Sequence, residues 1–355
     1  MTVTPDQVES PGRLRGVGSL GRYVLLRFLL IFPTVLILVS MVFVVMRVAG
    51  DPITASMGGR LTAEQLEQRL TEAGYNRPIL VQYLDYLGDL ARGDFGRTTD
   101  NQAITEVLIT YGTATLELAV YAGLLAMLIG IPLGRFAAYH RDRASDAVFR
   151  VLAILAYATP VFFAGLLLKL VFSVWLGWLP LGGRASTQTQ ISLGTIPGAS
   201  GLLTVDALRT GRADLIGDVF SHLVLPAVAL GLLTAGVFVR LVRTNMISTL
   251  SMPYVDAARS RGVRESRLVR THAYRPALIP IVTVMGMQLA LMLGGAILTE
   301  TTFEWRGLGF ELARYLAARD YVAVQGIVAL LAVIVALTNF LVDVVAAFID
   351  PRVRY

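Results

Sequence analysis

The sequence contains no cysteine in its 355 residues. Disulfide bonds and thiolate-ligated metal sites are therefore excluded. Charged residues are also scarce, at 16% against about 25% in an average soluble domain, whereas hydrophobic residues make up 55% of the chain. The mean hydropathy is +0.64. This composition predicts an all-α integral membrane protein instead of a soluble one.

Several motifs of catalysis are missing as well. No GxxxxGK[ST] phosphate-binding loop occurs, so a chain of this kind is not expected to hydrolyse ATP by itself. There is no G-x-S-x-G elbow and no HExxH pair, and the three histidines lie in three different segments, which argues against an intramembrane hydrolase. The net charge of +6 lies in short segments between apolar runs and does not form a basic face, so no nucleic-acid partner is expected.

What the sequence does contain is long apolar runs. Six of them are long enough to cross a hydrocarbon core, which takes about 20 helical residues. They cover residues 24–46, 113–134, 148–176, 222–242, 279–299 and 321–348. The first run has 19 uncharged residues between Arg27 and Arg47 and no small-residue cleavage site after it, so it is predicted to stay as a membrane span and not to be a signal peptide.

The loops between these runs predict the orientation. The N-terminus, 135–150, 240–278 and the C-terminus together hold 18 of the 30 arginines and only seven acidic residues. Because basic loops stay in the cytoplasm, both termini and the 243–278 loop are predicted to be cytoplasmic. Trp175 and Trp178 would close the outer end of the third span, where amphipathic rings favour the interface.

The chain divides accordingly into five parts. These are a cytoplasmic N-terminal segment 1–23, a first transmembrane helix 24–46, an extracytoplasmic helical subdomain 47–112, a five-helix core 113–348 that contains the loop 243–278, and a cytoplasmic tail 349–355.

Two outer segments have different patterns. In 47–112, Thr62 and Gln65 form a capping-box pattern, Gly74 suits a helix C-terminus, and a second short helix is predicted from Pro78. This subdomain is either a cap that packs on the spans or a docking surface for an extracytoplasmic partner. The segment 177–221 is rich in Gly, Thr, Ser and Pro without sustained periodicity, and is predicted to be an outer loop.

The inner loop 243–278 is the longest cytoplasmic connection. Ser251 is a candidate N-cap and Pro253 suits the first turn of a helix whose N-terminus Asp256 would complement electrostatically. Ala258 and Gly262 are four residues apart and would share one smooth face, which allows another surface to approach closely. The alternative is that the surrounding arginines only set topology and that this face packs against the underside of the bundle.

Three charged residues inside the predicted spans need an explanation, Glu117, Lys169 and Asp343, and Asn339 lies four residues before Asp343. Ionisable groups in hydrocarbon are costly and usually face an interior or a cavity. Glu117 would lie near the outer start of its span, Lys169 is placed to extend outward, and Asn339 and Asp343 share a helix face. Either a role in the transport pathway or a role in helix packing fits them, and packing is favoured.

Specific strings resemble a known family. DAARSRG (256–262) is similar to the cytoplasmic Glu-Ala-Ala-x-x-x-Gly signature of ABC importer permeases, with Asp256 in place of the glutamate. Further strings resemble the dipeptide/oligopeptide branch, in particular its first permease. They are GDP (50–52), RPILVQYLDYLGDLARGDFG (77–96), TATLELAV (113–120), RPALIPIVTVMGMQLALMLGGAILTETTFEWRGLG (275–309), ARDYVAVQG (318–326) and NFLVDVVAAFIDPRVR (339–354). The signature's closing Ile-x-Leu-Pro is poorly matched, because His272, Tyr274 and Arg275 stand there and Pro276 comes one place late.

The resemblance implies a six-helix type I ABC importer permease in a bacterial inner membrane. It implies a heterodimer with a second permease, two separate ATP-binding subunits that hold ATP and Mg²⁺, and an extracytoplasmic peptide-binding protein, with no cofactor on this chain. The residues expected to couple the chain to the ATPases are Asp256, Ala257, Ala258, Arg259, Arg261 and Gly262. The alternatives are an importer permease for nickel chelates or another small solute and, less favoured, a secondary transporter, for which we find no convincing internal repeat.

Overall fold

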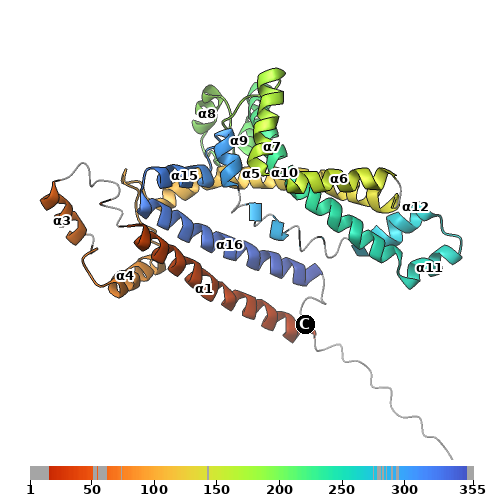
Figure 1. Cartoon of the computed structure of the whole chain (residues 1–355), viewed down its shortest axis with the longest axis horizontal. Coiled ribbons are helices and arrows are strands. Elements are labelled where there is room, and N and C mark those ends of the chain that lie inside the picture. Colours follow the sequence, from red (N-terminus) through yellow and green to blue (C-terminus); the bar gives the residue numbers. More distant parts are fainter. Residues whose placement is uncertain are drawn as a thin grey trace, which may run out of the picture.

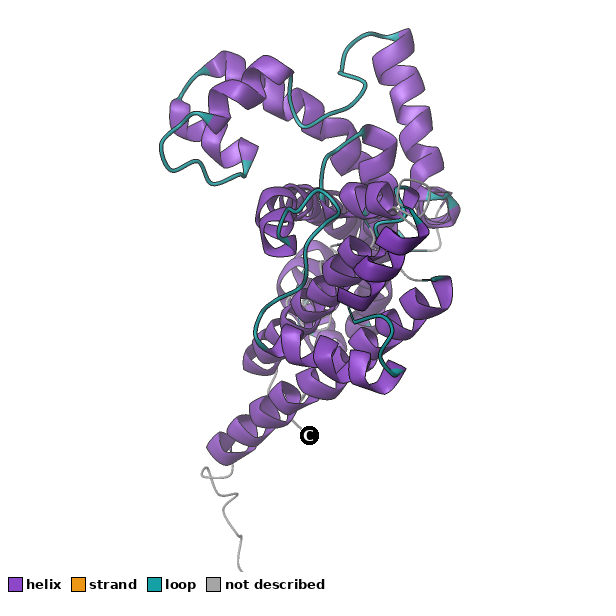
Figure 2. Cartoon of the chain, turned by 90° about the vertical axis from the view of Figure 1, so that its left-hand side faces the viewer, coloured by secondary structure: helices purple, strands orange, loops and turns teal. Residues whose placement is uncertain are grey.

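The structure is a computed structural model, and it describes residues 16–50, 54, 62–72, 74–141, 144–274 and 296–349, with isolated positions between 275 and 295. Every regular element in these ranges is helical, and the single β-type contact there is an isolated bridge between Arg97 and Ala103. The helices are joined by loops of varied length (Figure 1, Figure 2). The predicted all-α class is confirmed.

Four helices of the described ranges are long and apolar enough to cross a membrane. They are α1 (Gly16–Ala49), α5 (Ile104–Tyr139), α10 (Ala213–Leu250) and α16 (Tyr321–Ile349). They coincide with the first, second, fourth and sixth predicted spans. However, α5 and α10 have 36 and 38 residues, well beyond the roughly 20 that a hydrocarbon core requires, so both extend past it. The helix α5 begins at Ile104, nine residues before the predicted start of the second span at 113.

The third predicted span, 148–176, is not one helix. It consists of α6 (Ala144–Ala158), α7 (Val161–Leu168) and the π-helical segment η1 (Lys169–Trp175). The break lies at Pro160, whose ψ of 133° is non-helical and whose ring nitrogen has no N–H to donate. In Figure 1, α6 runs along α10, whereas α7 stands at a steep angle to α6.

Three predicted segments cannot be compared in full. The fifth span, 279–299, lies mostly outside the described residues, as do most of the terminal segments 1–23 and 349–355. Six spans therefore remain a prediction, of which four are long helices of the structure.

The central contact of the fold is between α5 and α10, and it is made by glycines. A Cβ atom added to Gly130 would lie 2.6 Å from Cβ of Phe238 and 2.9 Å from the carbonyl oxygen of Ala235. One added to Gly134 would lie 2.7 Å from Cβ of Val242. The two glycines are four residues apart, the spacing that lets helix backbones approach closely in membranes.

A second pair, α1 and α16, packs side by side (Figure 1). Arg27 and Asp343 form an ion pair at 3.0 Å, and the rings of Phe28 and Phe340 meet edge to face with centroids 5.8 Å apart. The start of α1 therefore lies beside the end of α16. Most other apolar side chains of α1 are exposed, as expected for a helix at the periphery of a membrane bundle.

Short helices lie at both ends of the molecule. The outer subdomain holds α3 (Ala63–Glu72) and α4 (Ile79–Ala91). The predicted capping box is confirmed, because the Gln65 side chain accepts from the Thr62 N–H at 3.1 Å and the Thr62 hydroxyl accepts from the Gln65 N–H at 3.3 Å. Gly74 follows α3 with a φ of +74°. At the far end of the long axis lie α11 (Pro253–Ser260) and α12 (Glu265–Arg267) (Figure 1).

The segment 177–221 is more ordered than predicted. It contains α8 (Thr187–Gly194) and α9 (Leu203–Thr210) and joins the start of α10. Leu193, Ala207 and Val219 are fully buried together there, so the segment has a small apolar core of its own. The hairpin of α14 (Ile297–Phe303) and α15 (Leu308–Ala317) packs close by.

We expect Gly134→Ala to lower the free energy of unfolding by about 1–3 kcal/mol, because the added methyl group has no space against α10. Gly217→Ala is the matched control, since a Cβ there meets nothing within 4 Å and the change favours a helix by about 0.5–1 kcal/mol. Thermal unfolding of the purified protein in detergent measures both. Equal stability of the two variants would contradict the close-contact interpretation.

Candidate coupling helix and buried polar cluster

The short helix α11 follows α10 almost directly. It begins at Pro253, which occupies the first turn as predicted. Ser251 is not its N-cap: the capping position is Met252, which makes no side-chain cap bond. Ser251 instead ends α10, and its hydroxyl donates to the carbonyl oxygen of Ile247 at 3.1 Å. Only two residues, Ser251 and Met252, separate the two helices, so Ser251 serves the end of α10 and Met252 takes the capping position of α11.

The end of α11 also differs from the prediction. The helix stops at Ser260, and Gly262 follows it with a φ of +78°. The N–H of Gly262 donates to Arg259 O at 2.9 Å and the N–H of Val263 donates to Ala258 O at 3.3 Å, the pair of bonds of a Schellman cap. Gly262 therefore does not share a helix face with Ala258. Its role is to end the helix in a backbone conformation that residues with a Cβ rarely adopt.

Charges cross-link α11 to the segment after it. The Arg259 guanidinium contacts the carboxylates of both Asp256 and Glu265. The hydrogen bond to Glu265 raises the pKa of Arg259 above its ordinary value. Because these groups are solvent-exposed, the pairs add little stability, and they fix the direction in which the side chains extend.

Most of the predicted coupling residues are on the surface. Val255 is fully buried, and α11 lies against the end of α10 and the π-helical segment η2 (Leu268–Ala273). Asp256, Ala257, Arg259, Arg261 and Gly262 are exposed, and Ala258 is half-buried. The structure thus brings the six residues together at one end of the molecule, on a helix held in place from one side.

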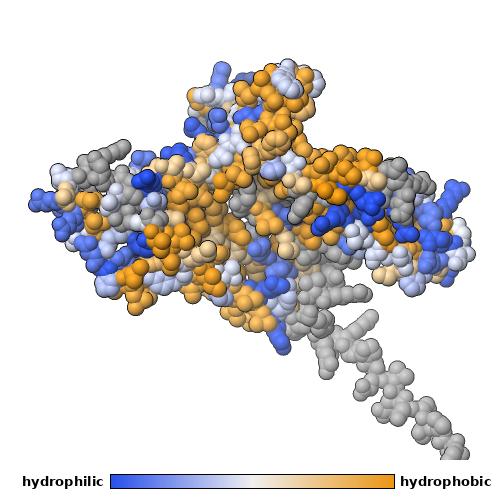
Figure 3. All heavy atoms as spheres, viewed as in Figure 1, coloured by the Kyte–Doolittle hydropathy of each residue, from blue (hydrophilic) through white to orange (hydrophobic). Residues whose placement is uncertain are grey.

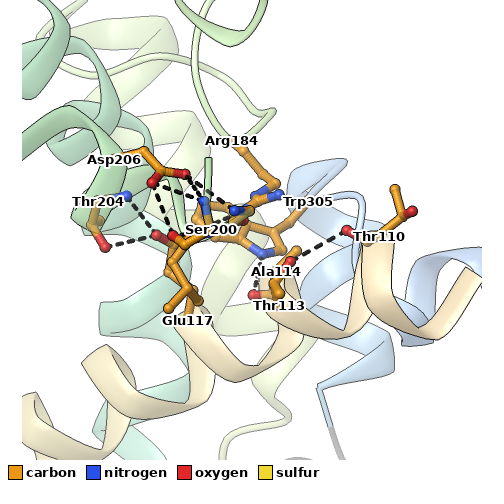
Figure 4. Close-up of polar contacts among 11 residues, drawn as sticks. Thr110, Thr113, Ala114, Glu117, Arg184, Ser200, Thr204, Asp206 and Trp305 are labelled. Carbon is orange, nitrogen blue, oxygen red and sulfur yellow. Dashed lines mark hydrogen bonds and ion pairs between the residues drawn. The ribbon is translucent and has the colours of Figure 1, made fainter. Parts of the chain in front are cut away.

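Glu117 lies within α5 and is only 2% exposed, because residues of the 177–221 segment cover it. One carboxylate oxygen accepts from both the N–H and the hydroxyl of Thr204, each at 2.7 Å. The other oxygen accepts from Arg184 at 2.7 Å. Both oxygens are thus bound to the segment that precedes α10 (Figure 4). A buried carboxylate that accepts three hydrogen bonds holds the residues that donate them against α5.

The cluster extends from Arg184 in two directions. Arg184 also donates to Gly201 O at 2.8 Å, and its guanidinium lies 5.7 Å from the centre of the Trp305 ring. The indole N–H of Trp305 donates to Ala114 O of α5 at 2.9 Å (Figure 4). Nearby, the Asp206 carboxylate accepts from the N–H and hydroxyl of Ser200. The cluster therefore joins α5, the 177–221 segment and the α14–α15 hairpin.

A second buried carboxylate lies between α5 and the hairpin. Glu300 is fully buried, accepts from the Thr115 hydroxyl at 2.6 Å and accepts from the N–H of Phe310 at 2.8 Å. Gly307 gives it room, since an added Cβ there would lie 2.3 Å from a Glu300 oxygen. The lack of space for a side chain at this position explains why residue 307 is a glycine.

The remaining polar residues of the spans have separate positions. Lys169 does not extend outward: its ammonium donates to Thr302 O at 2.8 Å and lies 5.7 Å from the centre of the Phe303 ring. Asp343 pairs with Arg27 of α1, whereas Asn339 is exposed. The structure therefore does not bring Lys169, Asn339 and Asp343 together with Glu117.

Sequence reasoning missed Arg184, Thr204, Trp305 and Glu300 as partners in the buried clusters. Glu117 is 67 residues from Arg184 and 87 from Thr204, so no local spacing reveals the contact. The available signal was that Arg184 is the only charged residue between Lys169 and Asp206, directly after a Gly-Gly pair.

These features define a multi-pass helical membrane protein with a buried ion-pair cluster before α10 and an exposed short helix after it. Residues 130–355 match the family model described as binding-protein-dependent transport system inner membrane component. The chain belongs to this family.

Curated relatives cover nearly the whole chain. The di/tripeptide transport system permease protein DppB of Pseudomonas aeruginosa is 36% identical over 92% of this chain and 96% of its own length. The dipeptide transport system permease protein DppB of Escherichia coli is 35% identical over 94% and 99%. The oligopeptide transport system permease protein AppB of Bacillus subtilis is 31% identical over 94% and 99%.

A solved structure has a similar fold. The MetNI methionine ABC transporter in an inward-facing conformation contains a chain that matches 69% of this one and 97% of its own length, with a TM-score of 0.51 and 16% identity. At this identity the likeness concerns the fold alone, and it supports the predicted type I importer permease architecture.

We expect Arg184→Met to destabilise the protein by about 3–5 kcal/mol, because it removes one partner of a buried ion pair. Adding Glu117→Gln should recover most of the loss, since the amide oxygen still accepts from Thr204 and no unpaired charge remains. Thermal unfolding in detergent measures both variants. The exposed pair Arg212–Asp214 provides the control, as Arg212→Met should change little. A double variant no more stable than Arg184→Met alone would contradict the role of the ion pair.

Proposed function

We propose that this chain is the transmembrane subunit of an ATP-driven importer of dipeptides or oligopeptides, and that it forms half of the translocation pathway with a second permease. The observation that carries this proposal is the similarity to peptide transport permeases over 92–94% of the chain at 31–36% identity. These relatives' names favour peptides over nickel chelates. A type I fold without a phosphate-binding loop in the sequence further supports a dependence on separate ATPases.

In this proposal α11 docks on an ATP-binding subunit that supplies ATP and Mg²⁺, and the chain itself binds no cofactor. The helix is mostly exposed, is anchored by Val255 and follows α10 after two residues. Closure of the ATPase pair would move α11, and α10 with it, as a rigid-body rotation. Asp256, Ala257, Ala258, Arg259 and Arg261 would contact the ATPase, and Gly262 would set where the helix ends.

The proposed orientation places both termini and α11 in the cytoplasm of a bacterium. The ion pair between Arg27 and Asp343 supports it, because it puts the start of α1 and the end of α16 at the same level. The opposite location of α3 and α4 supports an extracytoplasmic subdomain (Figure 1). A peptide-binding protein would deliver its ligand on that side, and ATP together with the loaded binding protein would favour one state of the bundle over the other.

Reconstitution of the chain with its candidate partner subunits in proteoliposomes tests this function. We expect uptake of a labelled dipeptide that requires ATP and the binding protein and that persists when a protonophore collapses the proton gradient. Uptake that follows the proton gradient without ATP would identify a secondary transporter and contradict the proposal.

The coupling role predicts the behaviour of Gly262. Gly262→Val should abolish peptide-stimulated ATP hydrolysis, because a β-branched residue is strained at a φ of +78° and the end of α11 must shift. Gly262→Asn should retain most of the activity, since asparagine tolerates this conformation. A Cβ at this position meets nothing within 4 Å, so the expected effect comes from the backbone and not from a clash.

Gly177→Val is the matched control for strain. Gly177 also has a positive φ, +62°, and open space around it, but it lies in the outer segment. It should leave peptide-stimulated hydrolysis intact in assembled complexes. Full stimulation in Gly262→Val, or equal loss in both valine variants, would contradict a specific role for the end of α11.

A further inference from the structure

The outer helix α4 has three different surfaces around its axis. The first is apolar and open: Leu80 is 66% exposed and Leu84 is 59% exposed, and Leu87 follows at the next helical position on the same face. No charged residue stands on this stripe. No residue of α4 is buried, and nothing in the part of the chain that the structure describes covers Leu80 or Leu84.

The second surface of α4 is polar. Gln82, Asp85 and Asp89 recur on the side opposite the leucines and line a hollow of about 290 Å³. Arg47 from the end of α1 and Gln325 from α16 face the same hollow. The polar side of α4 is therefore turned toward the bundle, and the apolar side is turned away from it.

The third surface holds α4 against α1. The hydroxyl groups of Tyr83 and Ser40 are 2.5 Å apart. The ring of Phe43 stacks on Tyr86 with centroids 5.5 Å apart and touches Tyr83 at 5.2 Å. These contacts place α4 at a defined level along α1.

That level is at the edge of the hydrocarbon layer. The 19 uncharged residues between Arg27 and Arg47 span about 28 Å as a helix, close to the thickness of a bilayer core of about 30 Å. Ser40 and Phe43 precede Arg47 by seven and four residues, which is about 10 Å and 6 Å along the axis. Tyr83 and Tyr86, which contact Ser40 and Phe43, therefore lie slightly deeper in the bilayer than Arg47. This is the interfacial level that aromatic side chains favour.

We propose that α4 is an interfacial membrane helix whose Leu80 and Leu84 side chains insert among the lipid acyl chains. Helices with one apolar and one polar face lie in this way, with the apolar face buried about 5–10 Å at the headgroup boundary. Figure 3 shows hydrophobic residues gathered over α4 and the neighbouring surface of α1. The occupant of the stripe is lipid, and the outer subdomain is thereby attached to the membrane surface as well as to α1.

The absence of cysteine makes a direct test possible. Leu80→Cys and Leu84→Cys are each labelled with a nitroxide in the assembled transporter in liposomes, and Asp85→Cys on the opposite, polar side of α4 is the matched control. Collisions with oxygen, which concentrates in lipid, are compared with collisions with a water-soluble nickel chelate. Nitroxide-labelled lipids calibrate the depth.

We expect the two leucine positions to have oxygen-to-nickel collision ratios several-fold above that of Asp85→Cys, at a depth near the headgroup boundary. A fluorophore at position 84 should also be quenched more by lipids brominated high on the acyl chain than by lipids brominated near its end. Ratios equal to the control would place the stripe in water and overturn the proposal. Protection from both reagents would mean that protein covers the stripe, and would overturn it in favour of a docking surface.

Discussion

The close contact between α5 and α10 is the constraint on which the other functional elements depend. Gly130 and Gly134 bring the two helices together because α5 places no side chain in the contact at these positions. One partner, α5, carries Glu117 and Thr115, which bind the outer cluster, and the other, α10, leads into α11. A residue larger than glycine would separate the helices and would displace both ends of the molecule at once, because packed interiors do not deform gradually.

This arrangement gives a physical route between the two ends. At 38 residues, α10 is about 57 Å long, so its two ends lie on opposite sides of a hydrocarbon core of about 30 Å. The Glu117–Arg184 cluster binds the segment before α10 to α5. At the other end, the Schellman cap at Gly262 fixes where α11, the helix after α10, ends. Because both ends are held by specific contacts, the proposed coupling would transmit a displacement of α11 to the 177–221 segment as a movement of the whole α5–α10 pair.

Sequence patterns predicted these elements unevenly, for reasons that are visible in particular residues. Run length alone predicted α1, α5, α10 and α16, since apolar composition is sufficient to identify a span. It did not predict the break at Pro160, because Pro132 and Pro226 stand in similar runs and stay inside their helices. The spacing of four between Ala258 and Gly262 predicted a shared helix face, but α11 ends at Ser260, before the chain reaches Gly262. The buried cluster needed contacts across 67 and 87 residues, which periodicity does not contain.

The peripheral helix α1 shows how a membrane protein can position a helix that has few buried side chains. Few of its apolar side chains are buried in the chain, so packing against α16 alone leaves its depth and tilt poorly determined. Polar contacts limit both: the ion pair to Asp343 lies near its start, and the hydroxyl contact from Tyr83 to Ser40 lies near its end. In a low-dielectric surrounding such contacts are strong, because water does not compete for them. Two polar contacts at different depths therefore position a helix whose remaining surface is free to face acyl chains.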